Sequence, residues 1–537
     1  MKTIQRLSLT VTATAILSGC GGSSFISTPV ENVDSSPLKV SELTEKEKHT
    51  WGHLDLVKDT IPGMSVEKAY EELLKNKKGA SVIVAVIDSG IDIDHEDLND
   101  VLWTNEDEIP GNGIDDDKNG YIDDVHGWNF LGDGYDEQLE LTRIVAKGDT
   151  SNPQYAAAKA EYDEEFQKWN DRKMRYEQIY AQLKAADETF VKHFGKADYT
   201  KEDINAIGAT TDEDLNKAVQ MAKFMFGNGL DSIQEAKEEI NSGLEHFADR
   251  LNYNLNVNFN GRVTGDNPDD MSTKFYGNGN VKPVKKSESH GTHVAGIIAA
   301  ERGNGLGVDG VANNVQIMSV RAIPNGDEYD KDIALAIRYA VDNGAKVING
   351  SFGKSYSPHS DWVREAIKYA ADHDVVFVHA AGNESKDVDV KPNFPDDNVN
   401  YVEIANNYIR VGALEPKYGS GLLAGFSNYG KKNVDVFAPG AKIYSTTPEN
   451  EYDTKGGTSM AAPAVAGVAA LIRSHFPDLN AGQVKQIILD SGLPLNLKVV
   501  VAGDTNDVRP FSELTTSGRI VNAYNALIMA AKESSAK

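Results

Sequence analysis

The sequence predicts an α/β fold, a doubly wound and mostly parallel sheet with helices on both faces, interrupted by an α-helical insertion. Uninterrupted β-branched runs, which are typical of strands buried on both faces of a parallel sheet, recur along the chain. Several of these runs are followed by segments with helical periodicity, and such alternation favours a parallel sheet. One long helical stretch breaks the alternation, so we expect it to leave the sheet.

The first strand is expected at residues 81–87, which read Ser-Val-Ile-Val-Ala-Val-Ile, after a helix at residues 66–74. Later strands are expected at residues 315–321, 346–349 and 375–380, with helices at residues 333–343 and 362–373 between them. The carboxyl ends of parallel strands meet at one edge of the sheet, where open α/β sheets place their ligands. The residues that follow each strand are therefore the first candidates for a functional site.

Residues 136–255 are predicted to form the helical insertion. Within residues 155–194, eight large apolar residues recur at steps of three, four or seven amid Glu and Lys, which predicts one long amphipathic helix. These residues are Tyr162, Phe166, Trp169, Tyr176, Tyr180, Leu183, Phe190 and Phe194. Two further helices are expected at residues 211–226, opened by Thr211, and at residues 232–251. We interpret the aromatic stripe as a helix-packing seam, with a groove for a substrate or partner as the alternative.

Length and charge restrict the classes of function. A chain of 537 residues exceeds one ordinary domain, which agrees with a core plus an insertion. The formal net charge is −27, from 54 basic and 81 acidic residues, and argues against a nucleic-acid partner. No feature of the sequence indicates an oligomeric state.

The N-terminal residues predict export and a lipid anchor. Lys2 and Arg6 precede an apolar stretch at residues 7–17, too short to span a bilayer but typical of a signal peptide. The following Leu-Ser-Gly-Cys at residues 17–20 resembles a bacterial lipobox, in which Cys20 carries diacylglycerol. Cys20 is the only cysteine, so no intramolecular disulfide is possible. The alternative is a chance cysteine in a leader that is removed.

Three short segments carry the chemistry. They read Asp-Ser-Gly-Ile-Asp at residues 88–92, His-Gly-Thr-His-Val-Ala-Gly at residues 290–296, and Gly-Thr-Ser-Met-Ala-Ala-Pro at residues 457–463. In this order they resemble the signatures around the catalytic Asp, His and Ser of subtilisin-like serine proteases, the subtilase family. The resemblance covers about residues 50–135 and 255–530, with the helical insertion outside it.

The same three residues satisfy the physical requirements of nucleophilic catalysis. A serine hydroxyl is a weak nucleophile until a positioned imidazole takes its proton, so Ser459 requires His290 nearby. Asp88 would orient that imidazole and stabilise its charged form. Ser459 precedes an apolar helical segment at residues 460–473, so its N–H group should lie in positive potential.

The resemblance also implies residues that contact the substrate. Asn383, in Ala-Ala-Gly-Asn at residues 380–383, corresponds to the family's side-chain donor to the oxyanion, and Gly382 beside it to a substrate-binding position. Ser351, Phe352 and Gly353 correspond to the segment that pairs with an extended peptide as an added strand.

An acidic loop at residues 115–124 predicts a calcium site. Asp115, Asp117, Asn119, the carbonyl of Tyr121 and Asp123 fall on positions 1, 3, 5, 7 and 9 of a calcium-binding loop. Position 12 is His126 instead of a bidentate glutamate, so a neighbouring carboxylate must complete the shell. A solvated acidic turn without metal is the alternative.

The sequence thus predicts a serine endopeptidase that hydrolyses protein or peptide substrates through an acyl-enzyme on Ser459. We expect a signal peptide at residues 1–19, a tether at residues 20–48, and a catalytic domain at residues 49–135 and 256–537 around the insertion. The expected location is a bacterial cell envelope, at the outer membrane if the source is Gram-negative. Two alternatives remain, namely an envelope processing protease of narrow specificity and an inactive binding protein that keeps the fold.

Overall fold

The computed structural model describes residues 27–31, 33, 36–75 and 77–537. The predicted signal peptide, the lipobox and Cys20 lie outside these residues. Within the described ranges, no helix combines the length and the apolar character that crossing a membrane requires.

A central sheet of nine strands confirms the predicted fold class among the described residues. Its spatial order is β12-β15-β9-β8-β5-β4-β1-β3-β2, and every neighbouring pair is parallel except β12 with β15. In chain order the strands are β1 (Val82–Asp88), β2 (Gly127–Asn129), β3 (Val315–Arg321), β4 (Val347–Gly350), β5 (Val376–Ala380), β8 (Tyr408–Leu414), β9 (Val436–Pro439), β12 (Leu493–Pro494) and β15 (Arg519–Ile520). The sequence pattern did not predict β2, β8, β9, β12 and β15.

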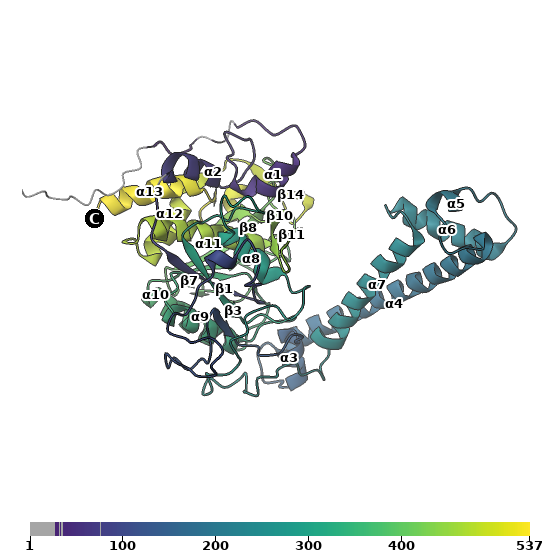
Figure 1. The fold of residues 1–537 in the computed structure, drawn as a ribbon, viewed down its shortest axis with the longest axis horizontal. Helices are drawn as coiled ribbons and strands as arrows, with labels where there is room; N and C mark the ends of the chain where they lie inside the picture. The colour runs from purple at the N-terminus through teal and green to yellow at the C-terminus, as the bar shows by residue number, and fades with distance from the viewer. Residues whose placement is uncertain (1–26, 32, 34–35, 76) are drawn as a thin grey trace, which may run out of the picture.

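Helices cover both faces of this sheet (Figure 1). On β1, Val84 and Val86 face one hydrophobic cluster, whereas Ala85 and Ile87 face another, as the alternation of a strand requires. The first cluster contains α8 (His290–Ala299), α11 (Thr458–His475), α12 (Ala481–Ser491) and α13 (Ala523–Ser535). The second contains α9 (Asp330–Asp342) and α10 (Ser360–Asp372).

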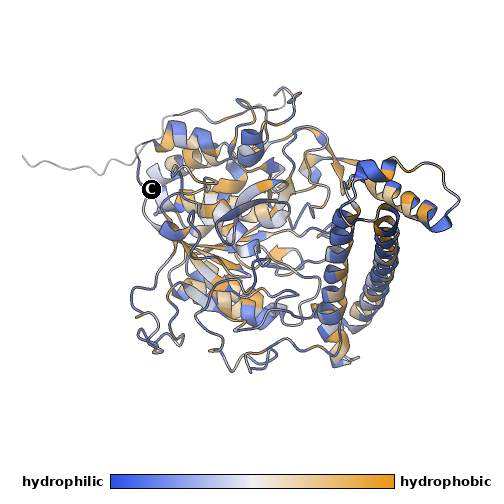
Figure 2. Cartoon of the chain, turned by 45° about the vertical axis from the view of Figure 1, so that its right-hand side comes forward, coloured by the Kyte–Doolittle hydropathy of each residue, from blue (hydrophilic) through white to orange (hydrophobic). Residues whose placement is uncertain are grey.

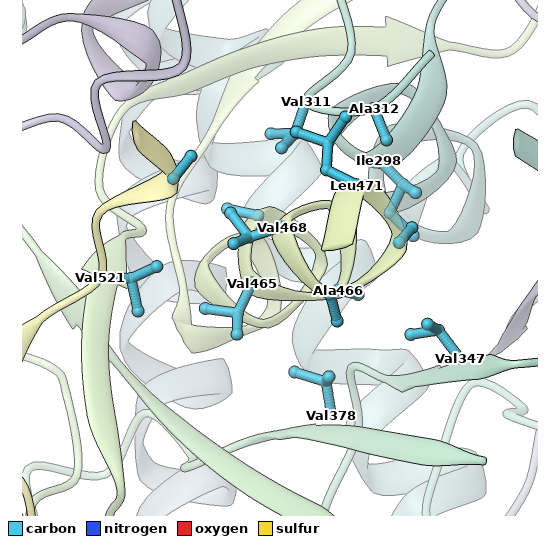
Figure 3. Packing of buried hydrophobic residues seen from close by; sticks show 14 of the residues in the cluster. Ile298, Val311, Ala312, Val347, Val378, Val465, Ala466, Val468, Leu471 and Val521 are labelled. Carbon is cyan, nitrogen blue, oxygen red and sulfur yellow. The ribbon is translucent and has the colours of Figure 1, made fainter. Parts of the chain in front are cut away.

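Helix α11 lies at the centre of the first cluster (Figure 3). Its residues Val465, Val468 and Leu471 are 0% exposed. Val465 lies on the side of α11 that faces Val378 of the sheet, whereas Leu471 lies beside Ile298 and Val311. The remaining inward positions of α11 are mostly Ala and Gly, whose small size allows close approach to the strands and to α8. The position of α11 is therefore strongly fixed.

The helical insertion projects away from the sheet (Figure 1). It comprises α3 (Glu140–Lys147), α4 (Tyr155–Phe194), α5 (Lys201–Asn205), α6 (Glu213–Gly227) and α7 (Ile233–Asp249). The rings of Trp169 and Tyr176 on α4 lie 5.6 and 4.8 Å from the ring of Phe247 on α7. These contacts support the packing-seam interpretation of the stripe, and the outward faces of the projecting helices are largely hydrophilic (Figure 2).

The helices expected at residues 333–343 and 362–373 begin slightly earlier, as α9 and α10, and two further helices also differ from the prediction. The helix expected from Thr211 begins at Glu213, because the Asp212 side chain accepts hydrogen bonds from the N–H groups of Asp214 and Leu215 and so caps it. The helix expected at residues 66–74 is divided into α2 (Val66–Ala69) and a π-helical turn at Tyr70–Leu74. Its apolar residues Leu73 and Leu74 still enter the first cluster.

The remaining elements are short and peripheral. Antiparallel pairs are formed by β6 (Asn398–Val399) with β7 (Val402–Glu403), β10 (Ile443–Thr447) with β11 (Glu451–Lys455), and β13 (Lys498–Val501) with β14 (Asp504–Pro510). Helix α1 (Glu45–Thr50) begins in the predicted tether. Farther towards the N-terminus, Val33 is 1% exposed and the backbone of Val30 exchanges two hydrogen bonds with the Asn525 side chain. This part of the tether thus packs on the core.

Candidate active site

The fold brings Asp88, His290 and Ser459 to the carboxyl edge of the sheet. Asp88 is the last residue of β1, His290 is the first residue of α8, and Ser459 is the second residue of α11. Ser351 directly follows β4, and Asn383 lies three residues after β5. Five residues singled out from the sequence therefore lie at the ends of neighbouring elements, where this sheet topology places a ligand.

Asp88 and His290 are joined by a direct hydrogen bond. His290 Nδ1 donates to Asp88 Oδ1 over 2.8 Å, and the N–H of Ser89 donates to the same oxygen over 2.8 Å. Burial lowers the pKa of His290, but the charge of Asp88 and its hydrogen bond outweigh this, so the pKa lies above its ordinary value. Asp88 is 1% exposed, which shields its interaction with the imidazole from solvent.

A buried ion pair lies beside Asp88. Arg321 of β3, which is 0% exposed and aligned with Asp88 in register, donates to the carbonyl of Ser89 over 2.9 Å and to Glu288 over 2.9 Å. Burial raises the pKa of Glu288, and the charge of Arg321 offsets only part of that effect. The Arg321 guanidinium thus holds the turn after Asp88 in place. It also balances the charge of the buried Glu288 carboxylate, two residues before His290.

Ser459 contacts residues 351–353, which are predicted to pair with the substrate and are called the substrate-edge segment below. Its hydroxyl donates to the carbonyl of Ser351 over 3.3 Å, and the Ser351 hydroxyl donates to the carbonyl of Ser459 over 2.8 Å. The amide of Asn349 in turn donates to the Ser351 hydroxyl over 3.0 Å. An extended peptide paired with this segment would therefore lie next to the Ser459 hydroxyl.

Asn383 Nδ2 and the Ser459 N–H lie near the same small space beside Gly457, and neither donates to a residue that the structure describes. Asn383 Oδ1 accepts hydrogen bonds from the N–H and the hydroxyl of Thr458, over 2.8 and 3.1 Å. A Cβ placed on Gly457 would lie 3.5 Å from Asn383 Nδ2 and 3.6 Å from the Ser459 nitrogen. Because the first N–H groups of a helix have no intrahelical acceptor, both groups can donate to one oxygen placed there.

The other predicted substrate-binding residues are divided between this edge and the core. Gly382 has φ +100°, and any side chain there would collide with Asn393 and Asn428, so the position requires glycine. Its N–H donates to the Thr458 hydroxyl over 3.0 Å. The Phe352 ring packs in the second hydrophobic cluster, whereas Gly353 lines a cavity.

Besides Arg321, sequence reasoning also missed Thr458 and Lys354, which position this site. Thr458 ties Gly382 to Asn383, but its neighbours in the serine motif give no signal of that role. Lys354, directly after Gly353, is buried and its ammonium group lies 2.9 Å from both Glu140 of the insertion and Asp330. A lysine in a polar segment gives no sign of burial, because its partners are distant in sequence.

The acidic loop gathers three carboxylates. Glu108, Asp115 and Asp117 place carboxylate oxygens within 4.8 Å of one another, so Glu108 is the neighbouring carboxylate that the sequence pattern required. No basic side chain in the described ranges pairs with these three carboxylates. Such a set of hard oxygen donors without a compensating cation fits Ca²⁺.

The other predicted ligands of the loop have different surroundings. Asn119 donates from Nδ2 to Asp117 and Asp124, and its Oδ1 accepts the N–H of Tyr121. Asp123 instead accepts the N–H groups of residues 112 and 113, so the structure does not bring its carboxylate into the group of three. The Tyr121 ring packs on aromatic neighbours in the second cluster.

Comparison with known proteins identifies the family of this chain. The model of the subtilase family matches residues 79–507, which is most of the chain. The chain therefore belongs to the subtilase family.

Similar proteins include several subtilisin-like proteases. Thermitase of Thermoactinomyces vulgaris is 39% identical over 270 residues, covering 50% of this chain and 82% of thermitase. The thermophilic serine proteinase of Bacillus sp. (strain AK1) is 46% identical over 188 residues, covering 35% of this chain but only 43% of that protein. Subtilisin-like protease 2 of Plasmodium falciparum is 35% identical over 314 residues, covering 57% of this chain and 21% of that protein.

The chain thus spans less than half the length of these last two relatives. A solved structure, a cold adapted subtilisin-like serine proteinase, is 28% identical, with a TM-score of 0.36 over 45% of this chain and 77% of that chain.

Removing the Arg321 guanidinium should lower the free energy of unfolding. In Arg321→Met, Glu288 remains buried without its partner, so we expect a loss of roughly 3–5 kcal/mol in the free energy of unfolding measured in urea. Arg321→Met combined with Glu288→Leu should recover part of this loss. Arg509→Met is the control, because its pair with Asp507 is solvent-exposed and should cost about 1 kcal/mol or less. A loss as small as that of the control would contradict the proposed role of Arg321.

Proposed function

We propose that this protein is a serine endopeptidase whose triad is Asp88, His290 and Ser459. The observation that carries the proposal is the 2.8 Å hydrogen bond from His290 Nδ1 to the buried Asp88. His290 begins α8, which packs against α11, and Ser459 lies in the first turn of α11. This bond leaves Nε2 of His290 as the basic nitrogen, the atom that must accept the proton of the Ser459 hydroxyl.

The first chemical step would be attack by the Ser459 oxygen on the carbonyl carbon of the scissile peptide. The serine proton moves to His290, and the carbonyl oxygen becomes an oxyanion. The Ser459 N–H and Asn383 Nδ2 would donate to this oxyanion, and such donors are typically worth about 3–4 kcal/mol each. The pairing of Asn383 Oδ1 with Thr458 supports this assignment, because it fixes which end of the amide faces outward.

The second half of the reaction would release both products. The tetrahedral intermediate collapses as His290 passes its proton to the leaving amine, which leaves an acyl-enzyme on Ser459. Water then attacks the ester with His290 again as base, and the acid product and the free hydroxyl are formed. Asp88 orients the imidazole throughout and stabilises the transient imidazolium.

Ser459→Ala should abolish casein hydrolysis by the purified protein and leave the fold intact. The triad acts as a unit, so we expect a loss in kcat on the order of 10⁶-fold. Ser272→Ala, at an exposed serine of the loop before α8, is the matched control and should hydrolyse casein at the parental rate. Unchanged hydrolysis by Ser459→Ala, with a parental circular dichroism spectrum, would refute the mechanism.

The insertion favours a narrow substrate range over a broad one. Lys354, next to the substrate-edge segment, is held by Glu140 of α3, and Arg143 of α3 donates to Glu140 over 2.7 Å. The base of the insertion is therefore fixed next to residues 351–353, where it can restrict the peptides that bind. A cleavage profile on a peptide library tests this role, since cleavage of most library members at similar rates would contradict it.

We propose a structural calcium ion at the acidic loop. Glu108, Asp115 and Asp117 would hold it, and Gly120, with φ +99° beneath the Phe275 ring, supplies the sharp turn that such a loop needs. The ion would neutralise the three carboxylates and brace the chain next to β2. Its role is structural, and peptide hydrolysis proceeds without its direct participation.

Chelation should lower the melting temperature of the Ser459→Ala protein, which cannot digest itself. A ligand that binds only the native state stabilises it by mass action, by about 2.7 kcal/mol at a concentration of 100 Kd. Asp117→Ala should erase the difference between excess Ca²⁺ and excess EGTA, whereas Asp171→Ala, on the exposed face of α4, should retain it. Equal melting temperatures in both conditions, in protein free of residual metal, would favour the solvated turn.

We further propose export and lipid attachment at Cys20, on the strength of the N-terminal sequence. The anchor would hold the enzyme at an envelope membrane, since a lipidated cysteine and its tether precede the folded core. Cys20→Ser should then move the protein from the membrane fraction to the soluble fraction of the cells. A variant that remains in the membrane fraction would contradict the lipobox interpretation.

A further inference from the structure

A cavity of about 390 Å³ lies between the substrate-edge segment and the helical insertion. One wall contains Gly353 and Asn393, and a second contains Glu384, the residue after Asn383. Glu165 of α4 and Arg250, which follows α7, line it from the insertion. A side chain of a peptide paired with the Gly353 segment could therefore enter a space that the core and the insertion build together.

Each acidic group of this cavity accepts a hydrogen bond, although only Glu165 pairs with a cation among the residues that the structure describes. Glu165 lies 2.6 Å from Lys168 and accepts a hydrogen bond from Trp169. Glu161 accepts the Tyr356 hydroxyl over 2.7 Å, Glu384 accepts the Asn428 amide over 2.6 Å, and Asp327 accepts the backbone N–H of Glu140 over 2.8 Å.

Several cationic donors of the cavity are uncommitted by contrast. Lys386 and Lys391 line it, and neither ammonium group has a hydrogen bond or ion pair with any residue that the structure describes. Arg250 stacks on the Trp169 ring at 5.4 Å and donates to Asn254 over 3.1 Å, yet its buried Nε has no partner. What distinguishes Lys386 and Lys391 from other surface lysines is their position in the lining of a cavity that also contains Gly353 of the predicted substrate-binding segment.

We propose that this cavity is a substrate side-chain subsite that selects an acidic residue, with Lys386 and Lys391 as its specificity-determining residues. The proposal rests on the proposed peptidase function and names its substrate class. A carboxylate that enters the cavity would gain charge-assisted hydrogen bonds from donors that otherwise have none. A lysine or arginine of the substrate would meet cations instead, and a glutamine would gain only neutral hydrogen bonds.

The test compares peptides that are identical except for Glu, Gln or Lys at one position, taken in turn through the four residues on each side of the cleavage site. For the native protein we expect kcat/KM to be at least about 10-fold higher with Glu than with Gln at one of these positions, because hydrogen bonds to charged groups are the stronger class. The preference should fall as salt is added, since part of the attraction is exposed to solvent.

Variants test whether the preference for Glu depends on the cavity lysines or on other lysines of the surface. Lys386→Gln with Lys391→Gln should reduce the Glu/Gln ratio to less than about 3-fold, whereas Lys368→Gln, on the exposed face of α10, should keep the parental ratio. Lys386→Glu with Lys391→Glu should reverse the preference towards Lys. Each of these lysines lies at the surface or at the cavity wall, so every variant should fold, and circular dichroism checks that it does.

Two results would overturn the subsite. One is hydrolysis of Gln or Lys peptides at least as fast as Glu peptides at every position, and the other is a parental Glu/Gln ratio in the double Lys→Gln variant. If the native protein cleaves none of the peptides and no casein, the peptidase function itself fails and the subsite fails with it.

Discussion

The packing of α11 on the parallel sheet is the constraint on which the site depends. Almost the whole helix is buried, and its small residues bring it against β4, β5, β8 and β9 at close range. Because a packed interior cannot shift a helix by an ångström without creating voids or clashes, the first turn of α11 has one position relative to the sheet. Ser459 lies in that turn, so the packing of the core also fixes the positions of its hydroxyl and N–H groups.

The same edge of the sheet then fixes what surrounds Ser459. β1 ends at Asp88, β4 leads to Ser351, and β5 leads to Asn383, so three strand ends deliver an acid, a substrate edge and a side-chain amide to one helix end. Hydrogen bonds from Ser351 to Ser459 and from Thr458 to Asn383 join these ends and hold the groups in fixed relative positions. The arrangement is preorganised, and a substrate would not need to order it.

The insertion extends this plan without disturbing it. It leaves the core after β2 and returns before α8, and its base is fixed by Lys354 and Glu140 next to the substrate edge. A long insertion adds little to the entropic cost of loop closure. The long separation of Asp88 from His290 in the sequence therefore does little to weaken the hydrogen bond between them. The insertion contributes part of the lining of the cavity beside Gly353, where we propose that substrates are selected.

Much of this could be predicted from the sequence, and the exceptions have physical reasons. The buried runs of β1 and β3 and the aromatic period of α4 are long and regular, so their class and position followed from pattern alone. Strands β2, β12 and β15 are too short to carry a pattern. The roles of Thr458, Glu108 and Lys354 depend on partners brought close by the fold, such as Asn383, Asp115 and Glu140, and no local signal records them.

Labelling with a serine-directed phosphonylating inhibitor, followed by mass spectrometry, tests the central claim most directly. The account predicts a single label on Ser459, formed at a rate that rises with pH, because only neutral His290 can take the serine proton. The pKa of His290 is raised, so the midpoint of this rise should lie above the ordinary imidazole value of about 6.5, and Asp88→Asn should lower both the midpoint and the rate. A label on another residue, or a midpoint that Asp88→Asn leaves unchanged, would contradict the account.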